Sequence, residues 1–236
     1  MAKQYAVYTA SMGMMDWLYL PGGGGYENVD FICYSDDPEI WPEGCKDPTQ
    51  PWQIRHVERK WKGSNNDRKE AKYYKLHSHL LLPEYEATLW LDTRLCLRGL
   101  RKGFKNLKKD LALRRHPSRG CLYQEAAVCT KGGKDHPVSI AKQVGKYVEA
   151  GIKQKAGLWM GGIIFRKNTP AIAAFNELWW QEILDHSIRD QISLPYVLRE
   201  TGIDFQTLAR NVPNLQGHGH HRRSANAKTN ALQRKN

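Results

Sequence analysis

The chain has 236 residues, 41% of them apolar and eight of them tryptophan, which suits one sizeable buried core and is unlike the composition of a disordered protein. No run of about 18 apolar residues occurs, which argues against a transmembrane helix, and no secretory signal is apparent at the start, so we expect a cytoplasmic protein. The net charge of +12 is concentrated in residues 98–119 and 218–236. That favours an anionic partner such as nucleic acid, a polyanionic glycan or a membrane surface, although a solvated helix and a charged tail would give the same pattern.

Apolar runs and helix-forming segments alternate along the chain. From the N-terminus we expect strands at 5–10, 29–35, 52–57, 87–92 and 157–165, and helices at 67–82, 138–150, 169–187 and 190–199. This alternation predicts a single α/β domain over residues 1–210, with a mostly parallel central sheet and helices on both faces. A basic, histidine-containing tail follows at 211–236.

The ends of the expected strands are candidate binding positions, because ligands of such sheets bind beyond the carboxyl ends of the strands. These positions are Thr9, 35–37 and 92–94. Asp92 is the strongest candidate, since a carboxylate fixed at the end of a rigid strand can hold a divalent cation that neutralises a diphosphate leaving group. An acidic residue that only forms a turn would fit the same position.

A basic stripe runs along the helix that precedes this strand. Its members share one helix face through spacings of four, three and four residues, and they are Arg68, Lys72, Lys75 and His79. If that face meets the same sheet edge, its cations can bind phosphates, whereas a solvated face would show the same spacing.

Short motifs follow one another in a fixed order from about residue 5 to residue 200. In chain order they are Tyr8-Thr9-Ala10 with Asp16, Asp30-Phe31-Ile32-Cys33-Tyr34-Ser35-Asp36, Arg68-Lys69-Glu70-Ala71-Lys72, His79 with Pro83-Glu84-Tyr85, Trp90-Leu91-Asp92, His116-Pro117-Ser118-Arg119, Tyr123-Gln124-Glu125-Ala126, Trp179-Trp180 and Arg189-Asp190-Gln191. Each motif alone is weak evidence. The ordered series resembles the plant mucilage- and turgor-associated glycosyltransferase-like domain, which is similar to glycosyltransferase family 8-like enzymes.

The resemblance implies a GT-A-type, Rossmann-like enzyme that takes a nucleotide-diphosphate sugar such as a UDP-sugar, with Mn²⁺ or Mg²⁺ as its cofactor. It assigns to the donor Tyr8, Thr9 and Ala10 (base), Asp36 (base or ribose), Lys72 (phosphates), Asp92 (metal and diphosphate), Gly161 and Gly162 (sugar pocket), and Asp190 and Gln191 (donor sugar). The basic stripe adds Arg68 to this donor-binding set. Either Asp190 or Glu125 could take the proton of the acceptor hydroxyl, and Asp190 could equally be a helix N-cap.

The chain departs from the D-x-D motif of GT-A enzymes at one position. Arg94 stands in the place of the second acid, so a metal held by two carboxylates is not expected there. Either Arg94 supplies part of the positive charge on the diphosphate, or the tail supplies a metal ligand through His218 or His220.

Three functions remain compatible with the sequence. The first is glycosyl transfer from a nucleotide sugar to an acceptor, and the basic segments favour a polyanionic glycan or a modified nucleic acid as that acceptor. The second is a non-catalytic module that binds a nucleotide sugar or a polyanion, which the loss of the second D-x-D acid makes more credible. Sugar nucleotidyl transfer is the third, but no glycine-rich phosphate loop with a following lysine occurs near the N-terminus.

Overall fold

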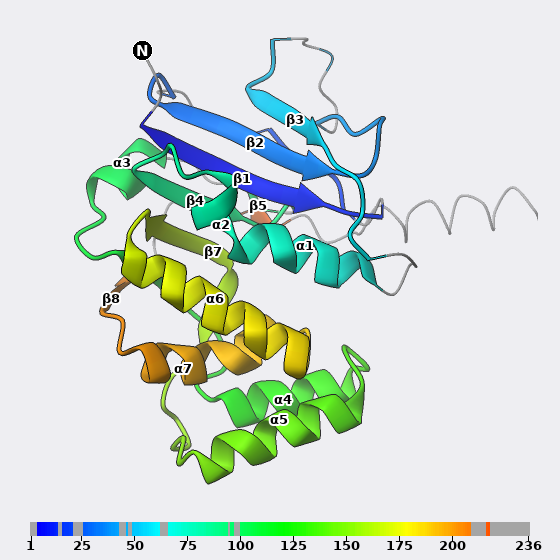
Figure 1. Ribbon diagram of the computed structural model, residues 1–236, viewed down its shortest axis with the longest axis vertical. Coiled ribbons are helices and arrows are strands. Elements are labelled where there is room, and N and C mark those ends of the chain that lie inside the picture. The colour runs from blue at the N-terminus through cyan, green and yellow to red at the C-terminus, as the bar shows by residue number, and fades with distance from the viewer. Residues whose placement is uncertain are drawn as a thin grey trace, which may run out of the picture.

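Seven strands form one central sheet in the order β3–β2–β1–β4–β7–β6–β8 (Figure 1). The computed structural model describes residues 4–13, 16–20, 26–42, 46, 49–61, 66–93, 95–96, 100–208 and 216–217. The strands are β1 Tyr5–Ser11, β2 Val29–Ser35, β3 Trp52–His56, β4 Ala87–Leu91, β6 Leu111–Arg115, β7 Trp159–Lys167 and β8 Phe205–Leu208. β7 is antiparallel to β4 and β6, and every other neighbouring pair of this sheet is parallel. The carboxyl ends of the parallel strands and the start of β7 therefore lie along one edge.

Helices lie on both faces of this sheet, as predicted for a single Rossmann-like α/β domain. Their bounds are α1 Asp67–Leu76, α2 Ser78–Leu81, α3 Leu100–Lys105, α4 Leu122–Lys131, α5 Pro137–Glu149, α6 Pro170–Asp185 and α7 Asp190–Thr201. A second, two-stranded sheet pairs β5 (Leu95–Cys96) with β9 (Gln216–Gly217).

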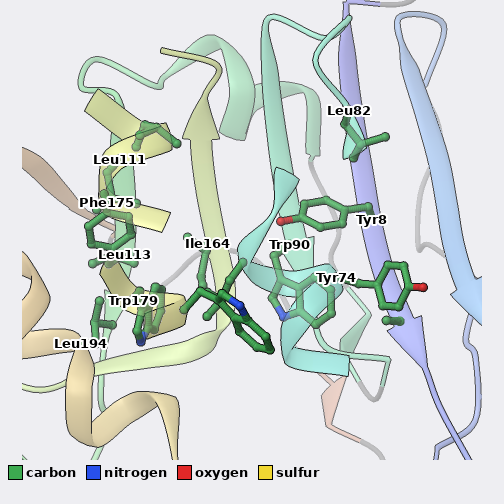
Figure 2. Packing of buried hydrophobic residues seen from close by; sticks show 14 of the residues in the cluster. Tyr8, Tyr74, Leu82, Trp90, Leu111, Leu113, Ile164, Phe175, Trp179 and Leu194 are labelled. Atoms are coloured by element: carbon green, nitrogen blue, oxygen red, sulfur yellow. The ribbon is translucent and has the colours of Figure 1, made fainter. Parts of the chain in front are cut away.

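Two hydrophobic clusters pack against the central sheet, one on each of its faces. Tyr8 of β1 and Trp90 of β4 pack with Trp179 of α6 in the first cluster, beneath α1, α6 and α7 (Figure 2). Val7, the neighbour of Tyr8, enters the second cluster with Phe104 of α3. Central strands that are buried on both faces explain the nearly continuous apolar runs in the sequence.

α4 and α5 add an outer layer beyond α7 (Figure 1). They pack through a third cluster that joins Leu122 and Cys129 of α4, Ile140 and Tyr147 of α5, and Ile192 of α7. α7 is therefore covered on two sides, by the sheet and by the α4–α5 pair. This position matters because the start of α7 carries the Arg-Asp-Gln motif.

The structure corrects two expectations about helices. The helix expected at 67–82 is divided at His77, whose ring Nδ1 lies 2.7 Å from the carbonyl oxygen of Tyr73. The alternative that residues 98–119 form a solvated helix does not hold for the whole segment, because Leu111–Leu113 are the buried first three residues of β6. β6 takes a place between β7 and β8, and its flanking basic residues lie at the ends of the strand.

Among the residues that the structure describes, no helix is both long and apolar enough to cross a membrane. The expected domain boundary near residue 210 and most of the basic tail lie outside the described residues.

Candidate active site

A pocket opens at the edge where the parallel strands end. Ala10–Met12 at the end of β1 and Asp92–Thr93 after β4 form its floor. Arg68 and Lys72 of α1 line it on one side, and Ile188–Arg189 before α7 line it on another. The pocket thus lies beyond the carboxyl ends of the strands, where the strand pattern predicts a binding site.

Asp92 is fixed at this edge by its own strand and by β7. The indole Nε1 of Trp90 donates to Asp92 Oδ1 at 2.7 Å, and the backbone nitrogen of Asp92 donates to the carbonyl of Gly162 at 3.0 Å. The other carboxylate oxygen, Oδ2, accepts no hydrogen bond from the described residues. The carboxylate therefore stands in a defined orientation at the pocket.

Asp190, the first residue of α7, binds two lysines of α1 through one oxygen. Lys72 Nζ lies 2.6 Å from Asp190 Oδ2, and Lys75 Nζ bonds to the same oxygen. Lys75 and Asp190 are buried, and the side chain of Lys72 is 18% exposed. The backbone carbonyl of Asp190 also accepts a hydrogen bond from Trp179 Nε1 at 3.2 Å. The spacing of Lys72 and Lys75 on one helix face is thus used for a buried ion pair rather than for a solvated face.

The environment of Asp190 changes the protonation of this group of side chains. Burial alone would raise the pKa of the Asp190 carboxyl, but Lys72, Lys75 and Arg189 outweigh it and hold that pKa far below its usual range. Burial lowers the pKa of Lys72 to about 8, against the opposing attraction of Asp190. Asp190 is therefore an ionised carboxylate and a poor base, and the role of proton acceptor that the sequence offered to it is disfavoured.

Gly161 and Gly162 are the positions where β7 lets both carboxylates approach. A Cβ atom on Gly161 would lie 2.6 Å from Asp190 Oδ2 and 2.7 Å from Lys75 Nζ. A Cβ on Gly162 would lie 3.0 Å from Asp92 Oδ2. Glycine at these two positions is thus a requirement of packing, which accounts for the Gly-Gly pair in an otherwise bulky strand.

We expect Gly161→Ala to destabilise the fold by about 1–3 kcal/mol, as overpacking of a buried site does, and to displace the Lys75–Asp190 ion pair. Gly145→Ala is the matched control, because a Cβ there meets no atom within 4 Å. In the middle of α5 that change should stabilise by about 0.5–1 kcal/mol. Urea unfolding of both variants measures the difference, and a Gly161→Ala protein as stable as the wild type would contradict the contacts described here.

The residues assigned to the nucleotide base are divided between the pocket and the core. Ala10 lines the pocket. Tyr8 is fully buried, and its hydroxyl donates to the carbonyl of Lys75 at 2.8 Å and accepts from Arg166 at 2.8 Å (Figure 2 shows Tyr8 inside the core). Thr9 is buried as well. The side chains of Tyr8 and Thr9 therefore do not reach the pocket, because strand alternation and the covering helices enclose them.

Asp36 shapes the loop after β1 rather than lining the pocket. Its Oδ1 accepts a hydrogen bond from the backbone nitrogen of Gly13 at 2.8 Å, and its Oδ2 lies 2.9 Å from Arg59 Nε. Arg59 also forms an ion pair with Asp67 of α1, which does line the pocket. The contacts of Asp36 are thus with the protein, and a contact with base or ribose stays a prediction.

Glu125 and Gln191 are not among the residues that line the pocket. Glu125 is buried in α4, where it accepts from Arg119 Nε at 2.6 Å and from Cys129 Sγ at 3.3 Å. Gln191 Nε2 donates to the carbonyl of Trp159, the first residue of β7, at 3.3 Å. The Glu125 carboxylate is paired with Arg119 and does not line the pocket, so the catalytic role expected of Glu125 has no support in this geometry.

The described residues alone do not form a metal site. Within them no group of three or more histidine, cysteine, aspartate or glutamate side chains could hold an ion. Asp92 offers one carboxylate, and the other candidate ligands, His218 and His220, lie outside the described residues, as does Arg94, which would supply positive charge in place of a metal. Mn²⁺ or Mg²⁺ therefore stays a prediction.

Arg189 is a charged pocket residue to which the sequence analysis assigned no role. It lines the pocket beside Asp92 and Lys72, and its pKa is raised because the attraction of Asp190, Cys129 and Glu125 outweighs burial. Its place in the Arg-Asp-Gln motif was the available signal, but only the two residues that follow it were assigned a role.

Comparison with known proteins adds the family. The family model of the TOD1/MUCI70 glycosyltransferase-like domain matches residues 49–210, more than half of the chain. The match includes Lys72, Asp92, Gly161 and Asp190, while β1 and β2 precede it. No curated protein matches the chain. The similarity to glycosyltransferase family 8 stays a prediction. The motifs and the family match agree, and the chain belongs to the TOD1/MUCI70 family of glycosyltransferase-like domains, with the general glycosyltransferase role that this family implies.

Proposed function

We propose that the chain transfers a sugar from a nucleotide-diphosphate sugar, most simply a UDP-sugar, to an acceptor hydroxyl. The observation that carries this proposal is the arrangement of charge at the pocket. Lys72 lines the pocket, and its positive charge is only partly neutralised, because the Asp190 carboxylate is shared between Lys72 and Lys75. A bound diphosphate would supply the negative charge that this group of cations lacks.

The same residues suit the chemistry of glycosyl transfer. As the sugar leaves, negative charge develops on the diphosphate, and fixed cations that face it lower the barrier. Lys72 is the described side chain best placed for this, since Asp190 holds its ammonium group at the pocket. Asp92, fixed by Trp90, would bind a metal or the diphosphate at the same pocket. Asp190 then acts on the reaction through Lys72.

A divalent cation would supply further neutralisation of the leaving group when it is bound. Asp92 would contribute one oxygen, and His218 or His220 of the tail would complete the ligands of the cation.

We expect removal of the chain after Gln216 to abolish Mn²⁺ stimulation and most of the activity. The double variant His218→Ala, His220→Ala should behave in the same way, whereas Arg222→Ala, Arg223→Ala, which removes only tail charge, should keep Mn²⁺ stimulation. A truncated protein that Mn²⁺ still activates would show that the tail provides no ligand.

The acceptor that we propose is anionic, a polyanionic glycan or a modified nucleic acid, on the ground of the net charge of +12. Part of the basic segment is already paired within the protein, since Lys109 binds Asp204 and Arg119 binds Glu125. Lys105 and Lys108 of the same segment form no ion pair with the residues that the structure describes, and we propose that they contact such an acceptor.

A non-catalytic nucleotide-sugar-binding module is the second candidate. The engagement of Asp190 and Glu125 in ion pairs favours it, because neither carboxylate is free to accept a proton.

A donor screen separates the two candidates. The purified protein is incubated with a panel of nucleotide sugars, with and without Mn²⁺, and mass spectrometry measures the nucleoside diphosphate released and the unreacted donor retained. We expect slow hydrolysis of at least one donor, as water replaces the acceptor. Binding of a donor without any release would favour the module, and the absence of both would reject the proposed donor class.

A further inference from the structure

We propose that Arg189 is a phosphate-binding residue of the donor site, acting beside Lys72 on the diphosphate. The inference rests on the proposed function and goes beyond it by naming a residue with a separate role in recognition of the donor. It is carried by the fixed position of Arg189, by the balance of charge around it and by the chemistry of its guanidinium group.

The segment that carries Arg189 is fixed by the turn between α4 and α5. Asp135 in that turn accepts two hydrogen bonds on Oδ2, from Ser187 Oγ at 2.6 Å and from the backbone nitrogen of Ile188 at 2.8 Å. The Ser187 hydroxyl in turn accepts a bond from the backbone nitrogen of Arg189 at 3.1 Å. The backbone carbonyl of Arg189 also accepts a hydrogen bond from the backbone nitrogen of Ile192 at 2.9 Å, at the start of α7. Its backbone is thus held at the pocket wall before any ligand binds, which lowers the entropic cost of binding.

The two carboxylates that attract Arg189 are already bound by other cations. Asp190 is bound by Lys72 and Lys75, and Glu125 is bound by Arg119. Arg189 thus shares its carboxylate neighbours with three other cations, and an anion bound at the pocket would give its guanidinium group a further partner. A nucleoside diphosphate carries charge of the required sign.

The guanidinium group of Arg189 still has hydrogen-bonding capacity to offer. Its Nε is buried and has no hydrogen-bond acceptor among the described residues. The guanidinium group has the Cys129 thiol as a side-chain hydrogen-bond partner, and its carboxylate neighbours Asp190 and Glu125 are bound at hydrogen-bond distance by other cations. A planar guanidinium that is not committed to a carboxylate can bind two phosphate oxygens side by side, which an ammonium group cannot do. This favours phosphate over a neutral sugar hydroxyl as its ligand.

The test compares the affinities of UDP, inorganic pyrophosphate and uridine for the wild type, Arg189→Met and Arg189→Lys. For Arg189→Met we expect a loss of about tenfold to a hundredfold for UDP and pyrophosphate, the range for a charge-assisted bond to phosphate. Uridine, followed by ligand-observed NMR, should bind all three proteins within about twofold, because it has no phosphate. Arg189→Lys should recover part of the lost affinity, since it keeps the charge without the planar donors.

Arg199→Met is the matched control, because Arg199 lies at the far end of α7 and pairs with Glu200 on the surface. It should bind UDP as the wild type does. If Arg189→Met does not fold, Arg189→Lys carries the test through its loss for UDP relative to uridine. Equal losses for UDP and uridine, or no loss for either, would overturn the inference and leave the proposed function standing. A wild type that binds neither UDP nor pyrophosphate would overturn both.

Discussion

Asp92→Ala should reduce turnover of the donor by about 100-fold to 1000-fold, the effect of removing one fixed electrostatic group from an active site. The carboxylate follows β4 at the pocket and is held by Trp90, and no cation of the described residues pairs with it at hydrogen-bond distance. The fold should stay intact, because the variant loses little more than the bond to Trp90, worth about 1 kcal/mol.

Asp92→Asn separates charge from geometry in this experiment. The amide oxygen can still accept the hydrogen bond from Trp90 Nε1, so the orientation is kept while the negative charge is lost. We expect its turnover to fall nearly as far as that of Asp92→Ala. Asp204→Ala, which removes an exposed acid paired with Lys109, serves as the control and should keep wild-type turnover. Wild-type turnover together with wild-type donor affinity in Asp92→Ala would reject the assignment of Asp92.

Lys72→Met should weaken donor binding by about tenfold to a hundredfold, because the donor phosphates lose a charged partner. The variant should fold, since Asp190 keeps its bond to the buried Lys75 and methionine matches the length of the lost side chain. Calorimetric titration with the donor selected by the screen measures the change. Lys131→Met, on the exposed end of α4, is the control for the loss of one positive charge.

The pKa of Lys72 gives this prediction a pH dependence. Burial lowers that pKa to about 8 in the free protein, and donor phosphates bind the protonated form. Donor affinity should therefore be constant below pH 8 and fall by up to about tenfold per unit as the pH rises through and above that value. Lys72→Arg should bind at constant affinity across this range, because arginine stays protonated. The same decline in Lys72→Met would show that another group causes it.

The central strands were predictable because their burial on both faces leaves a nearly continuous apolar run. β6 was missed for the opposite reason. Its buried part is only Leu111–Leu113, and basic residues precede and follow it closely. Its burial depends on β7 and β8, which flank it in the sheet but are distant in the sequence. No local pattern carries that information.

The position of a residue was predictable where a motif fixed it to a strand end or a helix start, and the structure places Asp92 directly after β4 and Asp190 at the start of α7. The environment of each side chain was not. The burial of Lys75 against Asp190 requires α7 to pack on the same layer as α1, and a sequence pattern does not show which face of a helix meets another helix. Tyr8 shows the same limit, because alternation along β1 allowed either face and the structure places its ring under the helices.

The position of the two phosphates in a crystal structure of the complex with UDP tests the central claim most directly. We predict that the diphosphate lies in the pocket at the ends of β1 and β4, within hydrogen-bond distance of Lys72 and Arg189 and next to Asp92. Phosphates bound at another surface, with this pocket occupied by solvent alone, would contradict the account.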